Sequence, residues 1–315
     1  MQPNGHVLRK VVLAVLFLCS IVAIMVMGVR AKADEKTAED RINTGVVVKA
    51  LENELQAEAE AIESRDEKID IFVNYVKING VTAQLKDGIV FVPVVFFSEA
   101  MDDCTVEFEN NTLRVNTDGL EFVAKIGDQY IVANNRYFYA EGKISIAEDG
   151  QIWLPLEVMA KVFGCEYNLD SVSKSAYLAP TGEFLEDGNT YYNEQDVYWL
   201  SRIINAESRG EPFIGQLAVG NVVMNRVEHH RYPDSIYGVI FDGAQFSPAV
   251  SGTVHLDPYQ ICIVAAKIVL EGYRLNDNIL FFYMMPVESS YRNGFEWTDT
   301  EIVIGNHYFY TYYGR

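Results

Sequence analysis

The chain of 315 residues is poor in the residue types that build metal and disulfide sites. It has 4 cysteines and 5 histidines, with no Cys-x-x-Cys pair and no His-Glu-x-x-His run. This scarcity excludes a disulfide-dense small scaffold and gives no support to a metal site, so we expect no metal and no cofactor. Basic residues are also scarce, because 25 Lys and Arg stand against 44 Asp and Glu, a formal charge of −19. Such a charge repels phosphate backbones, and no nucleic-acid partner is expected.

Apolar residues, in contrast, are plentiful. With 49% of its residues hydrophobic and 12% aromatic, the chain can bury real cores, which excludes a wholly disordered protein. Its length suits about two domains of roughly 150 residues. We therefore expect a multidomain protein with a leader over 1–33, an acidic helical spacer over 34–75, a β-rich domain over 76–180 and a mostly helical domain over 190–315.

The leader contains an uncharged run of 19 residues, Val11 to Val29, which follows the basic pair at 9–10. At about 1.5 Å per residue, a helix of this length spans the ~30 Å hydrocarbon core of a membrane. Residues 31–33 (Ala-Lys-Ala) resemble a signal-peptide cleavage site, so cleavage is the alternative to anchoring. Acidic residues at 34–35 place the remainder outside. We expect an exported protein, either anchored on the outer face of the cytoplasmic membrane or secreted to the wall.

The spacer is strongly acidic. Between residues 50 and 70, eight acids face two bases, and four leucine or isoleucine residues form a thin stripe at helical spacing. This segment is either a coiled-coil partner helix or a solvated helical spacer. So narrow a stripe favours the spacer.

A weak internal repeat marks the β-rich domain. Hairpin signals stand at 79–80 (Asn-Gly) and 87–88 (Asp-Gly). One copy opens with Val-Pro-Val at 92–94 and the other with Leu-Pro-Leu at 154–156. Each copy continues with a short amphipathic helix, a cysteine and a strand–turn–strand pattern. The segment 113–152 between them predicts further short strands with turns.

This repeat resembles the copper amine oxidase N-terminal-like module, with a match over about 76–180. The resemblance implies a non-catalytic adaptor and no copper. The absence of histidine from this range argues independently against an imidazole copper site. The repeated Cys104 and Cys165 are either a disulfide or duplicated packing positions, and we favour packing because free cysteine is a small buried hydrophobe.

The helical domain begins with a strong helix signal over 193–208, with Asn193 as its N-cap. Gly210 and Pro212 end this helix and begin the next. One face of the first helix carries a continuous stripe of Val197, Leu200, Ile203, Ile204 and Glu207.

Glu207 is the candidate catalytic acid. It lies in the last turn, where helix carbonyls give a negative potential, and its neighbours are apolar. Both effects disfavour the carboxylate and raise the pKa, as a general acid near neutral pH requires. Alternatively, Glu207 is an ordinary surface residue or is paired with Arg202 or Arg209.

Four sequence blocks give this domain a specific resemblance. They read WLSRIINAESRGEPFIGQLAVGNVVMNRV, YPDSIYGVIFDGAQFSP, ILFFYMMP and IGNHYFY, in that order over about 194–312. They resemble the SleB/CwlJ-type cell wall hydrolases, which include the spore cortex-lytic enzymes. The resemblance implies a lysozyme-like fold, cleavage of the glycan strand of peptidoglycan and, as in several members, lytic transglycosylation. It also implies that Glu207 is the catalytic acid.

The implied transglycosylation needs one carboxyl group, which acts first as acid and then as base. Plain hydrolysis needs a second carboxylate, about 5–5.5 Å away as a nucleophile or about 6.5–9.5 Å away to activate water. Glu211, Asp234 and Asp242 are available. We favour a helix N-terminal charge for Glu211 and turn roles for the other two, so none is assigned as the nucleophile.

The same resemblance suggests substrate-binding residues, which are Gln245, Ser247, Tyr283, Trp297 and Asn306. Packing explains several of them equally well: the turn at 245–247 would rest on its phenylalanine, and 281–285 would be a core strand. Methionine at 284–285 also departs from the Tyr-Asn-Pro pattern of the family.

Two further residues have structural interpretations. His307 is expected to be a hydrogen-bonded scaffold residue, and Cys262 to be a core residue rather than a thiol nucleophile. Two other functions stay open: a non-catalytic wall-binding protein, and an amidase acting on the stem peptide. Spore cortex and vegetative wall are both possible substrates.

Overall fold

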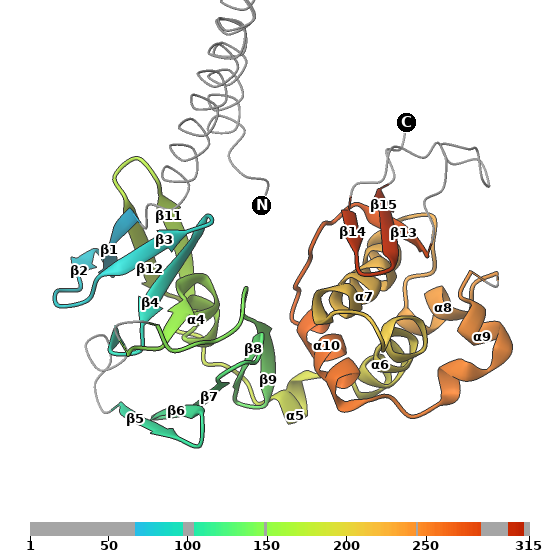
Figure 1. Cartoon of the computed structure of the whole chain (residues 1–315), viewed down its shortest axis with the longest axis horizontal. Coiled ribbons are helices and arrows are strands. Elements are labelled where there is room, and N and C mark those ends of the chain that lie inside the picture. The colour runs from blue at the N-terminus through green and yellow to red at the C-terminus, as the bar shows by residue number, and fades with distance from the viewer. Residues whose placement is uncertain (1–66, 97–103, 148–149, 244, 285–301, 312–315) are drawn as a thin grey trace, which may run out of the picture. The chain divides into compact units, whose positions relative to one another are not determined.

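A computed structural model describes residues 67–96, 104–147, 150–243, 245–284 and 302–311. The leader and most of the acidic spacer lie outside these residues (Figure 1). The end of the predicted spacer, Glu67–Val73, is a β-strand and not helical, because it pairs with neighbouring strands on both of its sides. No helix within the described ranges combines the length and the apolar character needed to cross a membrane.

The chain divides into two compact units. The first comprises Met1–Ile69 with Ala83–Phe91, and the second comprises Asp70–Thr82 with Val92–Arg315. Strands β1 (Glu67–Val73) and β4 (Ile89–Pro93) contribute residues to both units.

The described part of the first unit is a small antiparallel arrangement. Strand β3 (Ala83–Lys86) pairs with β1 on one side and with β4 on the other. Asp87 and Gly88 connect β3 to β4 with φ values of 51° and 83°. Positive φ at both central residues is the geometry of a tight hairpin turn, which confirms the hairpin predicted from Asp-Gly.

The second unit begins with a β-rich part. Strand β12 (Ser175–Pro180) runs parallel to β1 and antiparallel to β11 (Cys165–Asp170), while β2 (Val76–Lys77) pairs with the end of β1. Strand β10 (Trp153–Pro155) leads directly into helix α4 (Leu156–Val162). The strand–helix–strand pattern predicted after Leu-Pro-Leu is therefore confirmed in the second repeat. The equivalent helix of the first repeat lies outside the described residues.

A five-stranded antiparallel sheet follows the chain order β5-β6-β7-β8-β9, as the short strands and turns between the repeats predicted. Its strands are β5 (Thr105–Glu109), β6 (Thr112–Thr117), β7 (Leu120–Lys125), β8 (Tyr130–Ala133) and β9 (Arg136–Tyr139). One face of this sheet packs on Leu154 and on Met159 of α4 to form a hydrophobic core. Cys104 and Cys165 are free thiols, half-buried at the edge of the strands, in agreement with the packing interpretation.

The remainder of the second unit is mostly helical, as predicted, and includes a small sheet. The helices are α5 (Gly188–Tyr191), α6 (Glu194–Ser208), α7 (Phe213–Glu228), α8 (Ile236–Phe241), α9 (Ser247–Ser251), η2 (Thr253–His255) and α10 (Gln260–Leu270). The sheet has the antiparallel order β13-β15-β14, from Ile279–Tyr283, His307–Thr311 and Ile302–Ile304.

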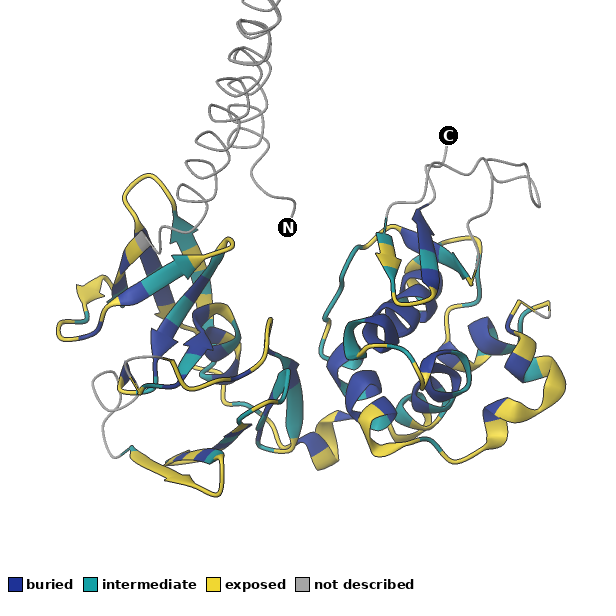
Figure 2. Ribbon diagram, viewed as in Figure 1, coloured by how far each residue is buried: buried dark blue, intermediate teal, exposed yellow. Residues whose placement is uncertain are grey.

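Helices α6, α7 and α10 form the core of this part, and Figure 2 shows that α7 is buried along much of its length. A methyl group added at Gly220 of α7 would lie 2.9 Å from Val269 of α10 and 3.0 Å from Ile204 of α6. Glycine therefore lets the three helices approach closely.

Strand β9 contacts the end of α10 within this second unit. The Arg136 guanidinium forms an ion pair of 2.6 Å with Glu271, and the Tyr192 hydroxyl donates to the same carboxylate at 2.6 Å. Tyr192 precedes α6, whereas Glu207 lies in its last turn. Fifteen residues of helix correspond to about 22 Å, so this contact lies at the far end of α6 from the candidate catalytic acid.

Candidate active site

Helix α6 places Glu207 as the sequence predicted. Asn193 caps it, because its side-chain oxygen accepts hydrogen bonds from the backbone N–H groups of Gln195 at 2.9 Å and Asp196 at 3.2 Å. The middle of the stripe is buried in the core, and Glu207 in the last turn is partly buried. Burial raises the pKa of Glu207 to about 7, although the positive charge of Arg226 opposes this shift.

The two arginines proposed as alternative partners of Glu207 are engaged elsewhere. Arg202 forms an ion pair of 2.7 Å with Asp257 and lies over the ring of Tyr198. The guanidinium of Arg209 lies 5.9 Å from the ring centre of Tyr259. Neither of these arginines forms an ion pair with Glu207, which is partly buried.

Arg226 of α7 is the residue that the sequence interpretation missed. Its side chain is buried, with 5% exposure, and its Nε donates to the carbonyl of Leu280 at 2.8 Å. The guanidinium carbon lies 4.9 Å from the ring centre of Phe246, 5.3 Å from that of Tyr232 and 5.4 Å from that of Phe281.

The charge of Arg226 connects several predicted site residues. Burial lowers the pKa of Arg226, while interactions with Tyr232, Tyr283, Asp242 and Glu207 raise it. Tyr283 and Glu207 were both predicted site residues, and Asp242 was a candidate second carboxylate.

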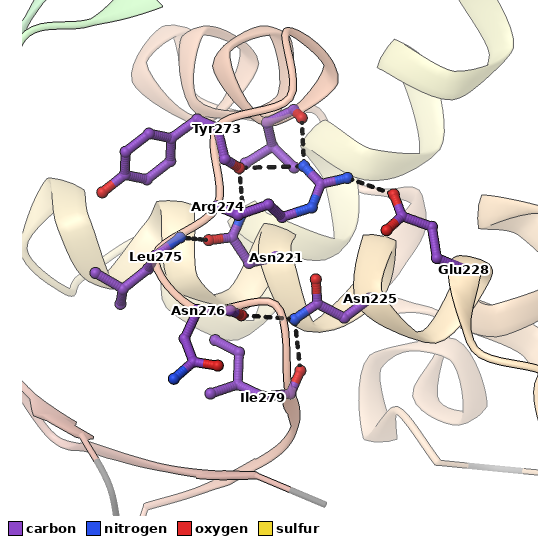
Figure 3. A network of polar contacts seen from close by, with 9 residues as sticks. Asn221, Asn225, Glu228, Tyr273, Arg274, Leu275, Asn276 and Ile279 are labelled. Carbon is purple, nitrogen blue, oxygen red and sulfur yellow. Dashed lines mark hydrogen bonds and ion pairs between the residues drawn. The ribbon is translucent and has the colours of Figure 1, made fainter. Parts of the chain in front are cut away.

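Polar side chains of α7 also fix the chain that leads to β13 (Figure 3). Asn221 accepts from the N–H of Leu275 and donates to the carbonyl of Tyr273, both at 2.7 Å. Asn225 donates to the carbonyls of residues 276 and 279, both at 2.9 Å. Because Arg226 then binds Leu280, three side chains of one helix hold this loop and the start of β13 in register.

The predicted substrate-binding residues have different environments. Gln245 is exposed and donates to Asp242 at 3.0 Å, and Ser247 is exposed at the start of α9. Phe246 between them is buried beneath the turn, as the packing alternative proposed. Tyr283 ends β13, which makes 279–283 a strand, and Trp297 lies outside the described residues.

Asn306 is hydrogen-bonded to another residue of the protein, Glu211. Its side chain donates to Glu211 at 2.9 Å, and its backbone N–H donates to the other oxygen at 2.8 Å. These bonds hold the pKa of Glu211 below its usual range. His307 is buried against Phe282 and Phe309, and burial lowers its pKa. Its Nδ1 has no hydrogen-bond partner among the described residues, so the ring is held by packing and the predicted hydrogen bond is not found at this nitrogen.

The described residues give no support to a thiol nucleophile at Cys262 or to a metal site. Cys262 is fully buried, its thiol donates to Gln216 at 3.4 Å, and burial raises its pKa to about 11, so it packs as predicted. Among the described residues, no group of three or more His, Cys, Asp or Glu side chains could hold a metal ion. A chain segment without histidine between 76 and 180 also lacks the donors that a copper site prefers.

Comparisons with known proteins agree with both predicted resemblances. Residues 210–310 match the Cell Wall Hydrolase family, and residues 72–178 match the copper amine oxidase N-terminal domain. The spore cortex-lytic enzyme of Bacillus cereus is 31% identical over 119 residues, which cover 38% of this chain and 45% of the relative. The corresponding enzyme of Oceanobacillus iheyensis is also 31% identical, over 38% of this chain and 42% of the relative.

The chain thus spans less than half the length of these curated relatives. A crystal structure of the catalytic domain of the Bacillus cereus SleB protein is 26% identical, covers 39% of this chain and 94% of that domain, and has a TM-score of 0.33. The stretch that matches the Cell Wall Hydrolase family therefore follows, along this chain, a stretch that matches the copper amine oxidase N-terminal domain.

Proposed function

We propose that this protein is a peptidoglycan-degrading enzyme that cleaves the glycan strand, with Glu207 as its catalytic acid. The observation that carries the proposal is a partly buried carboxyl group whose pKa of about 7 lets it hold a proton at neutral pH. The cell wall hydrolase match at 210–310 begins three residues after it and supplies the substrate class. The curated relatives are spore cortex-lytic enzymes, which favours cortex peptidoglycan as the substrate and germination as its setting.

The reaction begins with proton transfer. Glu207 donates its proton to the glycosidic oxygen between N-acetylmuramic acid and N-acetylglucosamine. The C1–O bond breaks, the leaving sugar departs as an alcohol, and C1 of the muramic residue acquires oxocarbenium character. Glu207 is now a carboxylate and can accept a proton in the second step.

We propose lytic transglycosylation for that second step. The muramic 6-hydroxyl oxygen bonds to C1 while Glu207 takes its proton, which gives a 1,6-anhydro product and restores the acid. One carboxyl group suffices for both steps. Two of the candidate second carboxylates are not placed for such a role, because Glu211 is hydrogen-bonded to Asn306 and Asp234 is exposed.

Hydrolysis is the second candidate reaction. The candidate second carboxylate for it is Asp242. Asp242 interacts with the same Arg226 charge as Glu207. Hydrolysis with inversion requires the Asp242 carboxylate to lie about 6.5–9.5 Å from that of Glu207, where it would activate a water molecule for attack on C1. Asp242→Asn separates the two reactions, because it should abolish hydrolysis and leave formation of the anhydro product.

The remaining parts of the chain have supporting roles in this proposal. The leader exports the protein and holds it at the outer face of the cytoplasmic membrane, or releases it to the wall if cleaved. The acidic spacer and the β-rich domain then carry the catalytic domain. Gln245, Ser247, Tyr283, Trp297 and Asn306 are proposed to contact the glycan.

The test compares purified protein with Glu207→Gln on isolated peptidoglycan. Glu194→Gln is the matched control, since Glu194 lies on the same helix and is exposed. We expect the control to retain activity and Glu207→Gln to lose at least 100-fold, the scale of general acid catalysis (roughly 10²–10⁴). Equal activity of Glu207→Gln and the unaltered protein would remove Glu207 as the catalytic acid, and no activity in either protein would leave the domain as a wall-binding module.

Mass analysis of the released muropeptides identifies the reaction. Anhydromuramic ends, lighter by one water than reducing ends, indicate transglycosylation. Reducing ends indicate hydrolysis, and free stem peptides would instead show an amidase.

A further inference from the structure

Five rings gather at the surface of the helical part, where α8 and η2 pack against the first half of α6. Trp199 of α6 is at their centre. Its four neighbours have ring centres 4.9–5.8 Å from that of Trp199, at steep interplanar angles of 63–89°. The neighbours are Tyr198, Tyr237, Phe241 and His255, and we call these five residues the aromatic cluster.

Packing alone does not account for how far the aromatic cluster is exposed. A ring that only holds two elements together is expected to be covered, as Phe246 is with 2% exposure. In contrast, Tyr237 is 54% exposed and Tyr198 is 39% exposed, although both contact Trp199. Single exposed aromatic residues are ordinary, but a contiguous group of them with a polar rim marks a binding surface.

An ion pair forms the polar rim of the aromatic cluster. The guanidinium carbon of Arg202 lies 3.8 Å from the ring centre of Tyr198, and Arg202 pairs with Asp257 at 2.7 Å. The Asp257 side chain is 95% exposed, so the pair offers hydrogen-bonding groups to solvent without a net charge. Such a rim suits a neutral polar ligand and gives no attraction to a polyanion.

The aromatic cluster is continuous with the proposed active site. Phe241 ends α8 and is followed directly by Asp242, whose carboxylate accepts a hydrogen bond from Gln245 at 3.0 Å. Gln245 is one of the proposed glycan contacts. On α6, Trp199 lies eight residues before Glu207, which is about 12 Å along the helix axis and about a quarter of a turn around it. A polymer that passes Glu207 can cover this distance, whereas a single sugar cannot.

We propose that the aromatic cluster is a second glycan-binding surface, on which sugar rings of the peptidoglycan strand stack outside the cleavage site. The inference rests on the proposed function, which supplies the glycan as ligand. A tyrosine or tryptophan suits a pyranose, because its face is apolar like the C–H groups of the sugar and its edge carries a polar atom for the hydroxyls. Contact here strengthens the binding of long strands without touching the sugars at which the bond breaks.

The test measures the binding of glycan strands freed of their stem peptides, in the full chain and in the Glu207→Gln variant. Tyr237→Ala removes the most exposed ring and should weaken binding about three- to tenfold, the scale of one aromatic contact. Tyr237→Phe keeps the ring and should bind within about twofold of its parent. Tyr198→Ala should weaken binding as Tyr237→Ala does, and it decides the question from α6 if Tyr237→Ala does not fold.

Tyr259→Ala is the matched control. Tyr259 lies in the same helical part with 59% exposure, but its ring lies near Arg209 and outside the aromatic cluster. This variant should bind glycan as its parent does. Unchanged binding in folded Tyr237→Ala and Tyr198→Ala, or an equal loss in Tyr259→Ala, overturns the proposal.

Two other occupants of the aromatic cluster have their own signatures. A second copy of the chain would appear as a dimer in light scattering that Tyr237→Ala dissociates. A membrane surface would appear as binding to phosphatidylcholine vesicles that the same variant loses. Either result, with glycan binding unchanged by Tyr237→Ala, replaces the glycan as the ligand.

Activity separates the aromatic cluster from the cleavage site. On long strands, Tyr237→Ala should raise KM about three- to tenfold and leave kcat in place, and on the shortest fragments that are cleaved it should act as the unaltered protein does. Full activity of Glu207→Gln with weaker glycan binding in Tyr237→Ala removes the catalytic acid and keeps the second surface. Loss of activity in Glu207→Gln with unchanged binding in Tyr237→Ala and Tyr198→Ala does the reverse.

Discussion

Glu211 and Asn306 are joined by two hydrogen bonds although 95 residues separate them. The backbone N–H of Asn306 donates to Oε2 at 2.8 Å, and its side-chain Nδ2 donates to Oε1 at 2.9 Å. Glu211 lies just before α7, and Asn306 lies in the turn between β14 and β15. The pair therefore ties the start of a core helix to the small sheet that also contains Tyr283.

Glu211→Gln tests this connection. The amide would place its NH₂ group against one of the two Asn306 donors, so one bond is lost and the other loses its charge. We expect the free energy of unfolding at pH 7 to fall by about 1 kcal/mol, because the pair is partly exposed to solvent. Urea denaturation of the full chain measures the change.

The pH dependence of this effect has a definite sign. Hydrogen bonds from Asn306 lower the pKa of Glu211 in the folded protein. Its stabilisation is therefore present above the ordinary glutamate pKa and is lost as the pH falls through the lowered value. The difference between Glu211→Gln and the unaltered protein should shrink toward zero in acid. A control, Glu228→Gln, removes a carboxylate with 62% side-chain exposure and should change stability by less than about 0.5 kcal/mol.

Gly305→Ala examines the same contact from the other side. Gly305 has φ of 57°, and an added methyl group would collide with the carboxylate of Glu211. We expect a loss of about 2–4 kcal/mol, from backbone strain and from displacement of Glu211. Gly252→Ala is matched in backbone, with φ of 81°, but has nothing within 4 Å of its added methyl group. Thermal unfolding should show a clearly larger loss for Gly305→Ala, and equal losses would contradict a specific role for the contact.

Local pattern was enough to predict the position of Glu207. In the folded helix Glu207 follows the buried Leu200 and Ile203 at the predicted spacing of seven and four residues. The predicted Asn193 cap and Asp87-Gly88 turn are also present. The Asn306–Glu211 bonds were beyond such reasoning, because they depend on how a distant turn packs on the start of α7. A substrate role for Asn306 therefore has to be tested with its structural role in view.

The same reasoning could have found Arg226. It lies three and four residues after Val223 and Val222, which places it on the buried side of α7 just as the stripe of α6 carries Glu207. A charged residue at that spacing was a sequence signal. The aromatic surroundings of Arg226 could not be predicted in this way, because the three rings come from three separate segments after α7.

Glu207→Gln should increase stability in mildly alkaline solution. The folded-state pKa is raised from 4.5 to about 7, so ionisation of this group favours unfolding as the pH rises through that value. At pH 8 the variant should be more stable by about 1–3 kcal/mol, and at pH 4 the two proteins should unfold alike. Denaturation curves at the two pH values measure this, with Glu194→Gln as an exposed control on the same helix. Equal stability at pH 8 would mean that Glu207 titrates like a solvated side chain.

The ion pair between Arg136 and Glu271 should be far more sensitive to substitution than its length alone suggests. Side-chain exposure is 14% for Arg136 and 4% for Glu271, and Tyr192 donates a third hydrogen bond to the carboxylate. Arg136→Met would leave that carboxylate buried without its cation, a loss of about 3–5 kcal/mol by comparison with other buried pairs.

A second pair provides the control for this prediction. Arg202 and Asp257 are 2.7 Å apart, but the Asp257 side chain is 95% exposed. Asp257→Asn should therefore change the unfolding free energy by less than about 1 kcal/mol. The double variant Arg136→Met with Glu271→Leu should recover part of the loss, because it leaves neither charge unpaired. Since this contact lies at the opposite end of α6 from Glu207, the pH at which activity declines should stay the same in every folded variant, and a shift would show that the contact reaches the active site.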